Sequence, residues 1–159
     1  MLEGAAECRP LSTRGLTAAP ACGENRAVRA LDLMRRYIEL ARAGDWDRAL
    51  GFFADDLVFH IPGRSAHAGE LHGRDAAARY IEAARTLSHG NHVEVEMIDM
   101  LASEERVALI VRERFDRPEG SVEIRRANVY RIEDDHIAEV WIFEHNQYEV
   151  DALMGALPL

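Results

Sequence analysis

Two side chains capable of proton transfer lie within one short and largely apolar stretch of the chain, residues 36–63. Tyr37 falls on the apolar side of a predicted helix, and His60 falls at the end of a predicted strand that runs into Pro62-Gly63. A buried phenol needs a hydrogen-bond partner, and in an apolar pocket a substrate carbonyl can be that partner. A neutral imidazole near pH 7 can accept or relay a proton. The stretch therefore indicates a small enzyme pocket with acid/base chemistry.

A third polar side chain interrupts an apolar strand face further along the chain. Asn128 shares its face with Ile124, Arg126, Tyr130 and Ile132. A buried amide is a costly choice for a core unless it has a hydrogen-bond partner. It can donate a hydrogen bond to a substrate oxygen without any change of pKa. We therefore favour a functional role for Asn128.

Two carboxylates, like Asn128, occupy positions in predicted strands that are otherwise largely apolar. Glu113 interrupts a strand face that is otherwise apolar, and Glu144 ends the last predicted strand. A carboxylate in an apolar pocket has a raised pKa and can act as an acid or a base. The alternative is that each lies at an end of the sheet and reaches water or a nearby arginine, with Arg112, Arg114 and Arg126 available.

These assignments predict four catalytic residues, Tyr37, His60, Asn128 and Glu144. The neighbouring side chains are predicted to bind the substrate: Phe59, Ile61, Arg64, Leu109, Val111, Glu113, Tyr130, Val140 and Ile142. Arg64, His67 and His72 follow the first strand in a loop suited to the rim of a pocket. The spacing of the two histidines is not that of a helical metal pair, so we predict no metal site and no cofactor.

The elements that must hold these residues begin near residue 25. Leu33, Met34, Tyr37, Ile38 and Ala41 form one apolar stripe of a first helix. Gly44 ends this helix, and Asp45 is suited to cap a second helix, whose apolar face comprises Trp46, Ala49, Leu50 and Phe53. A strand over 57–61, a loop to residue 73 and a third helix over 75–87 complete the first half.

From residue 91 the apolar pattern changes from a helical period to alternation. Strands are predicted at 92–102, 105–116, 121–133 and 136–145, joined by short connections that favour antiparallel neighbours. Helices followed by a meander indicate an α+β domain, with three N-terminal helices packed on one face of a curved, mostly antiparallel sheet. A final helix includes Val150, Leu153, Met154 and Leu157.

The last predicted strand is apolar on both of its faces. Val140 and Ile142 point one way, while Trp141 and Phe143 point the other. A sheet covered by helices on one side only has a second face that meets water, so large apolar residues there indicate another covering layer. We predict a homodimer through this outer face.

Composition and charge narrow the class of protein. The 159 residues fit one domain at 25–159, and the formal net charge of −9 argues against binding to nucleic acid or to an anionic membrane surface. Residues 1–24 indicate a disordered extension without a secretory signal. Cys8 and Cys22 do not form a disulfide framework, and we predict a cytoplasmic protein.

Three stretches carry a resemblance to a known family: RRYIELARAGDWDRALGFFADDLVFHIPG, GRDAAARYI and RIEDDHIAEVWIFEHNQYEV. Together with the order of elements, they resemble the NTF2-like superfamily, in its SnoaL-like and ketosteroid-isomerase-like branch. The resemblance covers about residues 27–154. It implies a cone-shaped α+β barrel that encloses a deep apolar pocket, usually in a homodimer. The fold hosts isomerases, cyclases, dehydratases, epoxide hydrolases and binding proteins, so it does not specify an activity.

The resemblance also implies roles for single residues. Tyr37 corresponds to the tyrosine that donates a hydrogen bond to an oxyanion in the ketosteroid-isomerase-like proteins. Asn128 corresponds to their protonated aspartic acid, a well-known case of a carboxyl group whose pKa is raised by its apolar surroundings. Their general base, an aspartate, corresponds to either His60 or Ile61. With His60 in that place the base is an imidazole, whereas with Ile61 the base is absent.

We therefore expect a cofactor-independent acid/base enzyme of the isomerase, cyclase or dehydratase type. Its expected substrate is a small apolar molecule that carries a carbonyl or hydroxyl group. One alternative is a dimeric binding module without chemistry, which His60 pointing away from the pocket would favour. A weaker alternative is an epoxide hydrolase in which Glu113 and Arg126 activate water.

Overall fold

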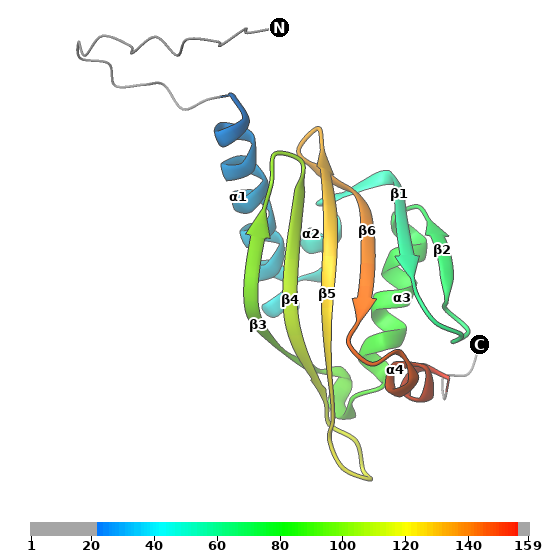
Figure 1. The fold of residues 1–159 in the computed structure, drawn as a ribbon. Helices are drawn as coiled ribbons and strands as arrows, with labels where there is room; N and C mark the ends of the chain where they lie inside the picture. Colours follow the sequence, from blue (N-terminus) through cyan, green and yellow to red (C-terminus); the bar gives the residue numbers. More distant parts are fainter. Residues whose placement is uncertain (1–21, 156–159) are drawn as a thin grey trace, which may run out of the picture.

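The computed structural model describes residues 22–155 of the chain (Figure 1). Residues 1–21 of the predicted extension and Leu157 of the predicted final helix lie outside the described residues. Residues 22–24, which the sequence analysis assigned to the extension, belong instead to the first helix.

Three helices precede or interrupt the first strands, and each begins or ends near its predicted boundary. They are α1 (Cys22–Arg42), α2 (Trp46–Leu50) and α3 (Arg74–Thr86), and a short helix, α4 (Gln147–Met154), follows the last strand. The predicted stop and cap are present: Gly44 has a positive φ of 75°, and the Asp45 side chain accepts a hydrogen bond from the backbone N–H of Arg48.

Six strands form one mixed sheet in the order β2-β1-β6-β5-β4-β3. Their bounds are β1 (Phe53–Ile61), β2 (Gly69–His72), β3 (Val93–Ala102), β4 (Arg106–Phe115), β5 (Val122–Glu133) and β6 (His136–Glu144). Strands β3 to β6 form the predicted antiparallel meander. Strand β1 pairs in parallel with β6 and antiparallel with β2. The architecture is α+β as predicted, but the sheet is not closed into a barrel.

The first strand differs most from the sequence-based expectation. Phe53, assigned to the second helix, begins β1, which is therefore four residues longer than the strand predicted at 57–61. Strand β2 lies within the stretch predicted as a loop. It is short and mostly polar, so it has no apolar alternation, and it forms because Leu71 pairs with Phe59 across the edge of the sheet.

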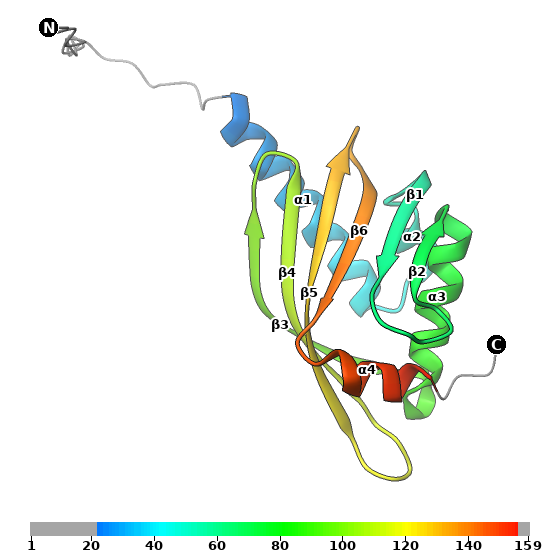
Figure 2. The same cartoon turned by 45° about the vertical axis from the view of Figure 1, so that its right-hand side comes forward.

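The helices cover one face of the curved sheet. Figures 1 and 2 show α1, α2 and α3 behind the sheet, while α4 lies at the end where β6 finishes. The core fills the space between these layers, with Met34 of α1, Ala77 of α3 and Phe53 and Leu57 of β1 among its fully buried residues. No helix of the described part is long and apolar enough to cross a membrane.

The outer face of the sheet carries apolar side chains between charged ones. Phe143 is 56% exposed, and Leu101 is similarly exposed at the far edge strand. Trp141 lies between His60 and Arg106, which stack on its ring at centroid distances of 5.2 and 6.0 Å.

Candidate active site

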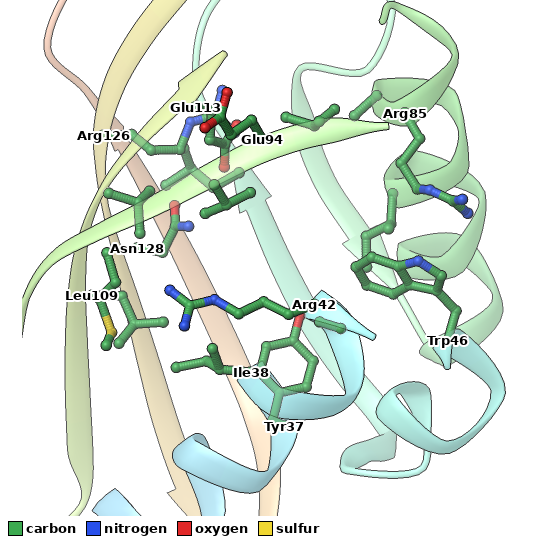
Figure 3. A pocket seen from close by; sticks show the side chains of 18 of the residues that line it. Tyr37, Ile38, Arg42, Trp46, Arg85, Glu94, Leu109, Glu113, Arg126 and Asn128 are labelled. Carbon is green, nitrogen blue, oxygen red and sulfur yellow. The ribbon is translucent and has the colours of Figure 1, made fainter. Parts of the chain in front are cut away.

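A cavity of about 420 Å³ lies between the helices and the inner face of the sheet. Its walls come from the last turn of α1, from α2, from α3 and from five of the six strands. Most of the lining is apolar, and the charged groups gather at two places (Figure 3). A cavity of this size and character is the usual form of a small-molecule site.

Eight residues predicted for the site line this cavity. They come from one helix and four strands, and the fold brings them together: Tyr37, Phe59, Leu109, Val111, Glu113, Asn128, Tyr130 and Ile142. The alternation predicted for β4 and β5 is responsible, since every second residue of each strand points inward.

A buried arginine joins two glutamates at one end of the cavity. Arg126 Nη2 lies 3.1 Å from Glu144 Oε1, and Arg126 Nη1 lies 3.5 Å from Glu113 Oε2. The side chains of Arg126, Glu113 and Glu144 are 7%, 15% and 2% exposed. The three residues lie on neighbouring strands, and Arg126 is directly opposite Glu144 in the β5–β6 register. We call these three residues the carboxylate–arginine cluster.

Burial sets the protonation of this cluster. The pKa of the Glu144 carboxyl is raised to about 7: its removal from water is the largest cause, the charge of Arg126 opposes it, and the charge of Glu113 adds to it. Burial lowers the pKa of Arg126, but Glu113, Tyr80 and Glu144 together raise it above its ordinary value, so Arg126 remains charged. Near neutral pH the cluster can therefore both hold and release a proton.

Several buried polar atoms of this region have no hydrogen-bond partner within the protein. Among the described residues there are four such side-chain atoms: Arg112 Nε, Arg126 Nε, Asn128 Oδ1 and Glu144 Oε2. Three of them belong to Asn128 and to the carboxylate–arginine cluster. An unpaired buried group costs roughly 1–3 kcal/mol, so a core would not retain three together without a use. They mark the end of the cavity where a polar ligand group would be held.

Three tyrosines add neutral hydroxyl groups to the same cavity. Burial raises the pKa of Tyr37, Tyr80 and Tyr130 above the ordinary value, so each remains protonated and can donate a hydrogen bond. The ring centroid of Tyr37 lies 5.5 Å from that of Phe53 and 6.2 Å from that of Tyr130. The negative charge of Glu113 contributes to the raised pKa of all three phenols.

His60, which we predicted as the general base, does not line the cavity. Phe59 and Ile61 point inward, so the alternation of β1 turns His60 to the outer face of the sheet. There its Nε2 lies 2.8 Å from Glu139 Oε1 and its Nδ1 lies 3.4 Å from Glu70 Oε1, while the ring stacks on Trp141. Ile61, the other residue considered for the place of the base, is buried and carries no titratable group.

Four other predicted site residues lie outside the cavity wall. Ile61 and Val140 are buried in the core instead. Arg64 is exposed, and only its backbone N–H is engaged, donating to Asp151 Oδ1 over 2.9 Å. Glu144 does not line the cavity directly because it lies behind Arg126, which does.

Other residues of the site were missed from sequence. Tyr80 falls in the third helix predicted at 75–87 but was not singled out, although a phenol among apolar residues was the signal that singled out Tyr37. Arg126 was considered as a possible ion-pair partner of Glu113 or Glu144 and, with Glu113, as an activator of water, but not as a residue that lines the cavity. Arg42, Trp46 and Arg85 also line the cavity. Trp46 was assigned only to the apolar face of the second helix, and the sequence pattern did not single out the two arginines. In the part of the chain that the structure describes, no three His, Cys, Asp or Glu residues are grouped to hold a metal ion.

Comparisons with known proteins agree with this architecture. The profile of the SnoaL-like domain matches residues 34–140. A search of curated protein sequences found no match. The structure of Bal32a, from a soil-derived mobile gene cassette, superposes with a TM-score of 0.72 at 22% identity, covering 82% of this chain and 99% of that one.

Two further solved structures carry the same fold. An NTF2-like protein from Burkholderia xenovorans LB400 has a TM-score of 0.64 at 16% identity, over 80% of this chain and 97% of that chain. A candidate polyketide cyclase from Xanthomonas campestris pv. campestris has a TM-score of 0.61 at 20% identity, over 81% of this chain and 98% of that chain. With its α+β fold of the NTF2-like type and the profile match over most of the described residues, the chain belongs to the SnoaL-like domain family.

Proposed function

We propose that this protein is a cofactor-independent acid/base enzyme of the isomerase, cyclase or dehydratase type. Its substrate is a small, mainly apolar molecule with a carbonyl or hydroxyl group. The observation that carries the proposal is the carboxylate–arginine cluster beside Asn128, placed at one end of an otherwise apolar cavity. The outward position of His60 favours the alternative of a binding module. We nevertheless propose an enzyme, because two carboxylates held by one arginine can supply the proton chemistry that we had expected from His60.

Glu113 is the proposed base because it both lines the cavity and contacts Arg126. Its carboxylate removes a proton from the carbon beside a substrate carbonyl, and the electron pair moves to the carbonyl oxygen. The neutral Tyr37 hydroxyl donates a hydrogen bond to that oxygen. Asn128 contributes either its amide hydrogens to an oxyanion or its unpartnered Oδ1 to a substrate hydroxyl.

The proton on Glu113 then determines the outcome. Its return to a different carbon gives isomerisation, and its transfer to a leaving hydroxyl gives dehydration. Attack of the carbanion on a second carbonyl gives cyclisation. Glu144 is a positioning residue in this scheme: its carboxylate holds Arg126, which in turn contacts Glu113. The sequence contains no lysine, so imine chemistry is not available.

The experiment is a screen of enones and β-keto compounds with matched variants. Glu113→Gln keeps the size of the side chain and is expected to lower kcat by at least about 100-fold, the usual effect of removing a general base. Glu94→Gln is the control, since Glu94 is exposed at the cavity and has no contact with Arg126. Equal turnover in the two variants would contradict the proposal. Ligand binding without turnover in any of them would favour the non-catalytic binding module.

A second candidate function is the hydrolysis of epoxides. It is favoured by the distance of 3.5 Å between Glu113 Oε2 and Arg126 Nη1, which is long for a direct hydrogen bond and lets both groups hold one water molecule. Styrene oxide in H₂¹⁸O is the test. Formation of a diol with one labelled oxygen by the wild-type protein, and no diol formation by Glu113→Gln, would support this function. Recovery of unchanged epoxide from the wild-type protein would exclude epoxide hydrolysis for this substrate.

We further propose that the protein is a homodimer through the outer face of its sheet. The support is the exposed Phe143 beside Trp141 on a face that no described helix covers. Phe143→Asp is expected to give a monomer in light scattering. Tyr148→Asp, which changes an 88% exposed aromatic residue of α4, is the control and leaves the mass unchanged. A monomeric wild-type protein would contradict this proposal.

A further inference from the structure

The cavity has a second charged feature, separate from the carboxylate–arginine cluster. Arg42, in the last turn of α1, lines the cavity with an exposed side chain. Figure 3 shows it extending over the cavity from the same helix as Tyr37, apart from Glu113 and Arg126. The helix is anchored by the buried residues Met34 and Tyr37, so the start of this side chain is held at the mouth.

Arg42 differs from the other arginines of the cavity in its partners. No carboxylate among the described residues lies within ion-pair distance of its guanidinium, whereas Arg126 contacts two. Arg85 also lines the mouth, but its Nη1 lies 2.8 Å from Glu82 and its guanidinium lies over the Trp46 ring at 5.5 Å. Arg42 is therefore the arginine of the mouth whose charge remains available to a ligand.

The remaining charges around the cavity decide how an anionic ligand would lie. Glu113 and Glu144 together outweigh Arg126, so the deep end repels an anion while it accepts a carbonyl or hydroxyl. Glu94 and His92 also line the cavity, and Figure 3 shows Glu94 on the same side as Glu113, where its charge adds to the repulsion of an anion. The whole chain has a formal net charge of −9, so Arg42 is a local positive charge that attracts an anion on an otherwise acidic protein.

We infer that the cavity takes an amphiphilic carboxylic acid: an apolar body whose carboxylate pairs with Arg42 at the mouth. The opposite end of the molecule, which bears the reacting carbonyl or hydroxyl, then faces Asn128 and Glu113. A guanidinium suits a carboxylate because it can donate two parallel hydrogen bonds. This inference depends on the proposed function for which end reacts, but the binding of the carboxylate can be measured without any turnover.

The test compares two probes of nearly equal shape, 2-naphthylacetic acid and 2-naphthylacetamide, by calorimetry at pH 7.5. The wild-type protein is expected to bind the acid more tightly than the amide. Arg42→Gln is expected to weaken binding of the acid by about three- to tenfold, a modest factor because the site is exposed, and to leave the amide unchanged. Arg42→Lys keeps the charge and is expected to retain part of the preference.

Arg85→Gln is the control, since it removes a second arginine of the mouth that already has partners. It is expected to change the affinity for the acid less than twofold. An acid-to-amide ratio unaffected by Arg42→Gln, or binding of neither probe to the wild-type protein, would overturn the inference. If the protein binds the acid selectively but turns over no substrate, the proposed enzyme activity is contradicted and the inference about Arg42 is not.

Discussion

Arg126 and Glu144 lie directly opposite each other on β5 and β6, and their side chains meet 3.1 Å apart with almost no access to water. The pair fixes the position of the guanidinium between two carboxylates, and it explains why a glutamate with a pKa of about 7 can remain inside the domain.

Glu144 makes stability depend on pH. Its ordinary pKa of 4.5 applies in the unfolded chain, and burial raises it to about 7 in the folded protein. Between these values the unfolded chain loses the proton first, so the contribution of Glu144 to stability falls as the pH rises from about 4.5 to about 7. It is constant below and above that range.

The measurement is urea unfolding from pH 4 to pH 8 for the wild-type protein and for Glu144→Gln. The variant cannot ionise at this position, so its stability relative to the wild type is expected to rise by up to about 3 kcal/mol across the range. Parallel curves for the two proteins would show that Glu144 titrates normally.

Arg126→Met is expected to destabilise the protein because it leaves two carboxylates facing each other without a cation. Removal of one partner from a buried ion pair costs about 3–5 kcal/mol. The loss is expected to be largest above pH 7, where Glu144 is ionised, and smaller near pH 5, where Glu144 is protonated. Urea unfolding at the two pH values measures this difference, and an equal loss at both would contradict it.

Tyr37 and His60 are expected to differ in their effect on catalysis. Tyr37→Phe removes a hydroxyl from the cavity and is expected to lower kcat by about 100-fold, as for other oxyanion donors. His60→Ala acts on the outer face and is expected to leave kcat within about twofold, with a loss of roughly 1 kcal/mol in stability from its half-buried contacts to Glu139. Loss of activity in His60→Ala, with activity retained in Tyr37→Phe, would contradict the placement of the active site in the cavity.

Gly63→Ala is expected to destabilise the protein. Gly63 has a positive φ of 95°, and a methyl group there would overlap the ends of the Asp151 and Gln147 side chains. Their displacement would weaken the hydrogen bond that the backbone N–H of Arg64, just after β1, donates to Asp151 Oδ1 of α4. Gly69 has a positive φ of 119° but open space around it. Gly63→Ala is therefore expected to lose roughly 1–3 kcal/mol more than Gly69→Ala, since only the former adds overpacking to backbone strain. Thermal unfolding of both variants checks this difference.

Much of the fold could be predicted from the pattern of the chain. The apolar stripe through Met34 and Tyr37 gave the first helix, and the alternation after residue 91 gave the meander, because both signals are local. The parallel pairing of β1 with β6 could not be obtained in this way. It depends on contacts between segments far apart in the sequence and leaves no local mark.

The site was predicted less completely for a related reason. The alternation of Leu57, Phe59 and Ile61 was visible, but His60, two residues before Pro62, resembled the family's base position. A difference of one residue in register reverses the face on which a side chain lies. Arg126 could be seen as a partner for Glu113, but its pairing with Glu144 required the β5–β6 register. Tyr80 joins the cavity only through the packing of α3.

The parallel pair of β1 and β6 also has a consequence for the order in which the domain can form. His60 and Glu139, which meet across this pair, are separated by 79 residues. A ribosome must complete almost the whole domain before β1 can take its place beside β6, and closing such a long loop slows folding. During synthesis the helices and the meander can precede this step. The wall that carries Phe59 is therefore among the last parts of the cavity to be assembled.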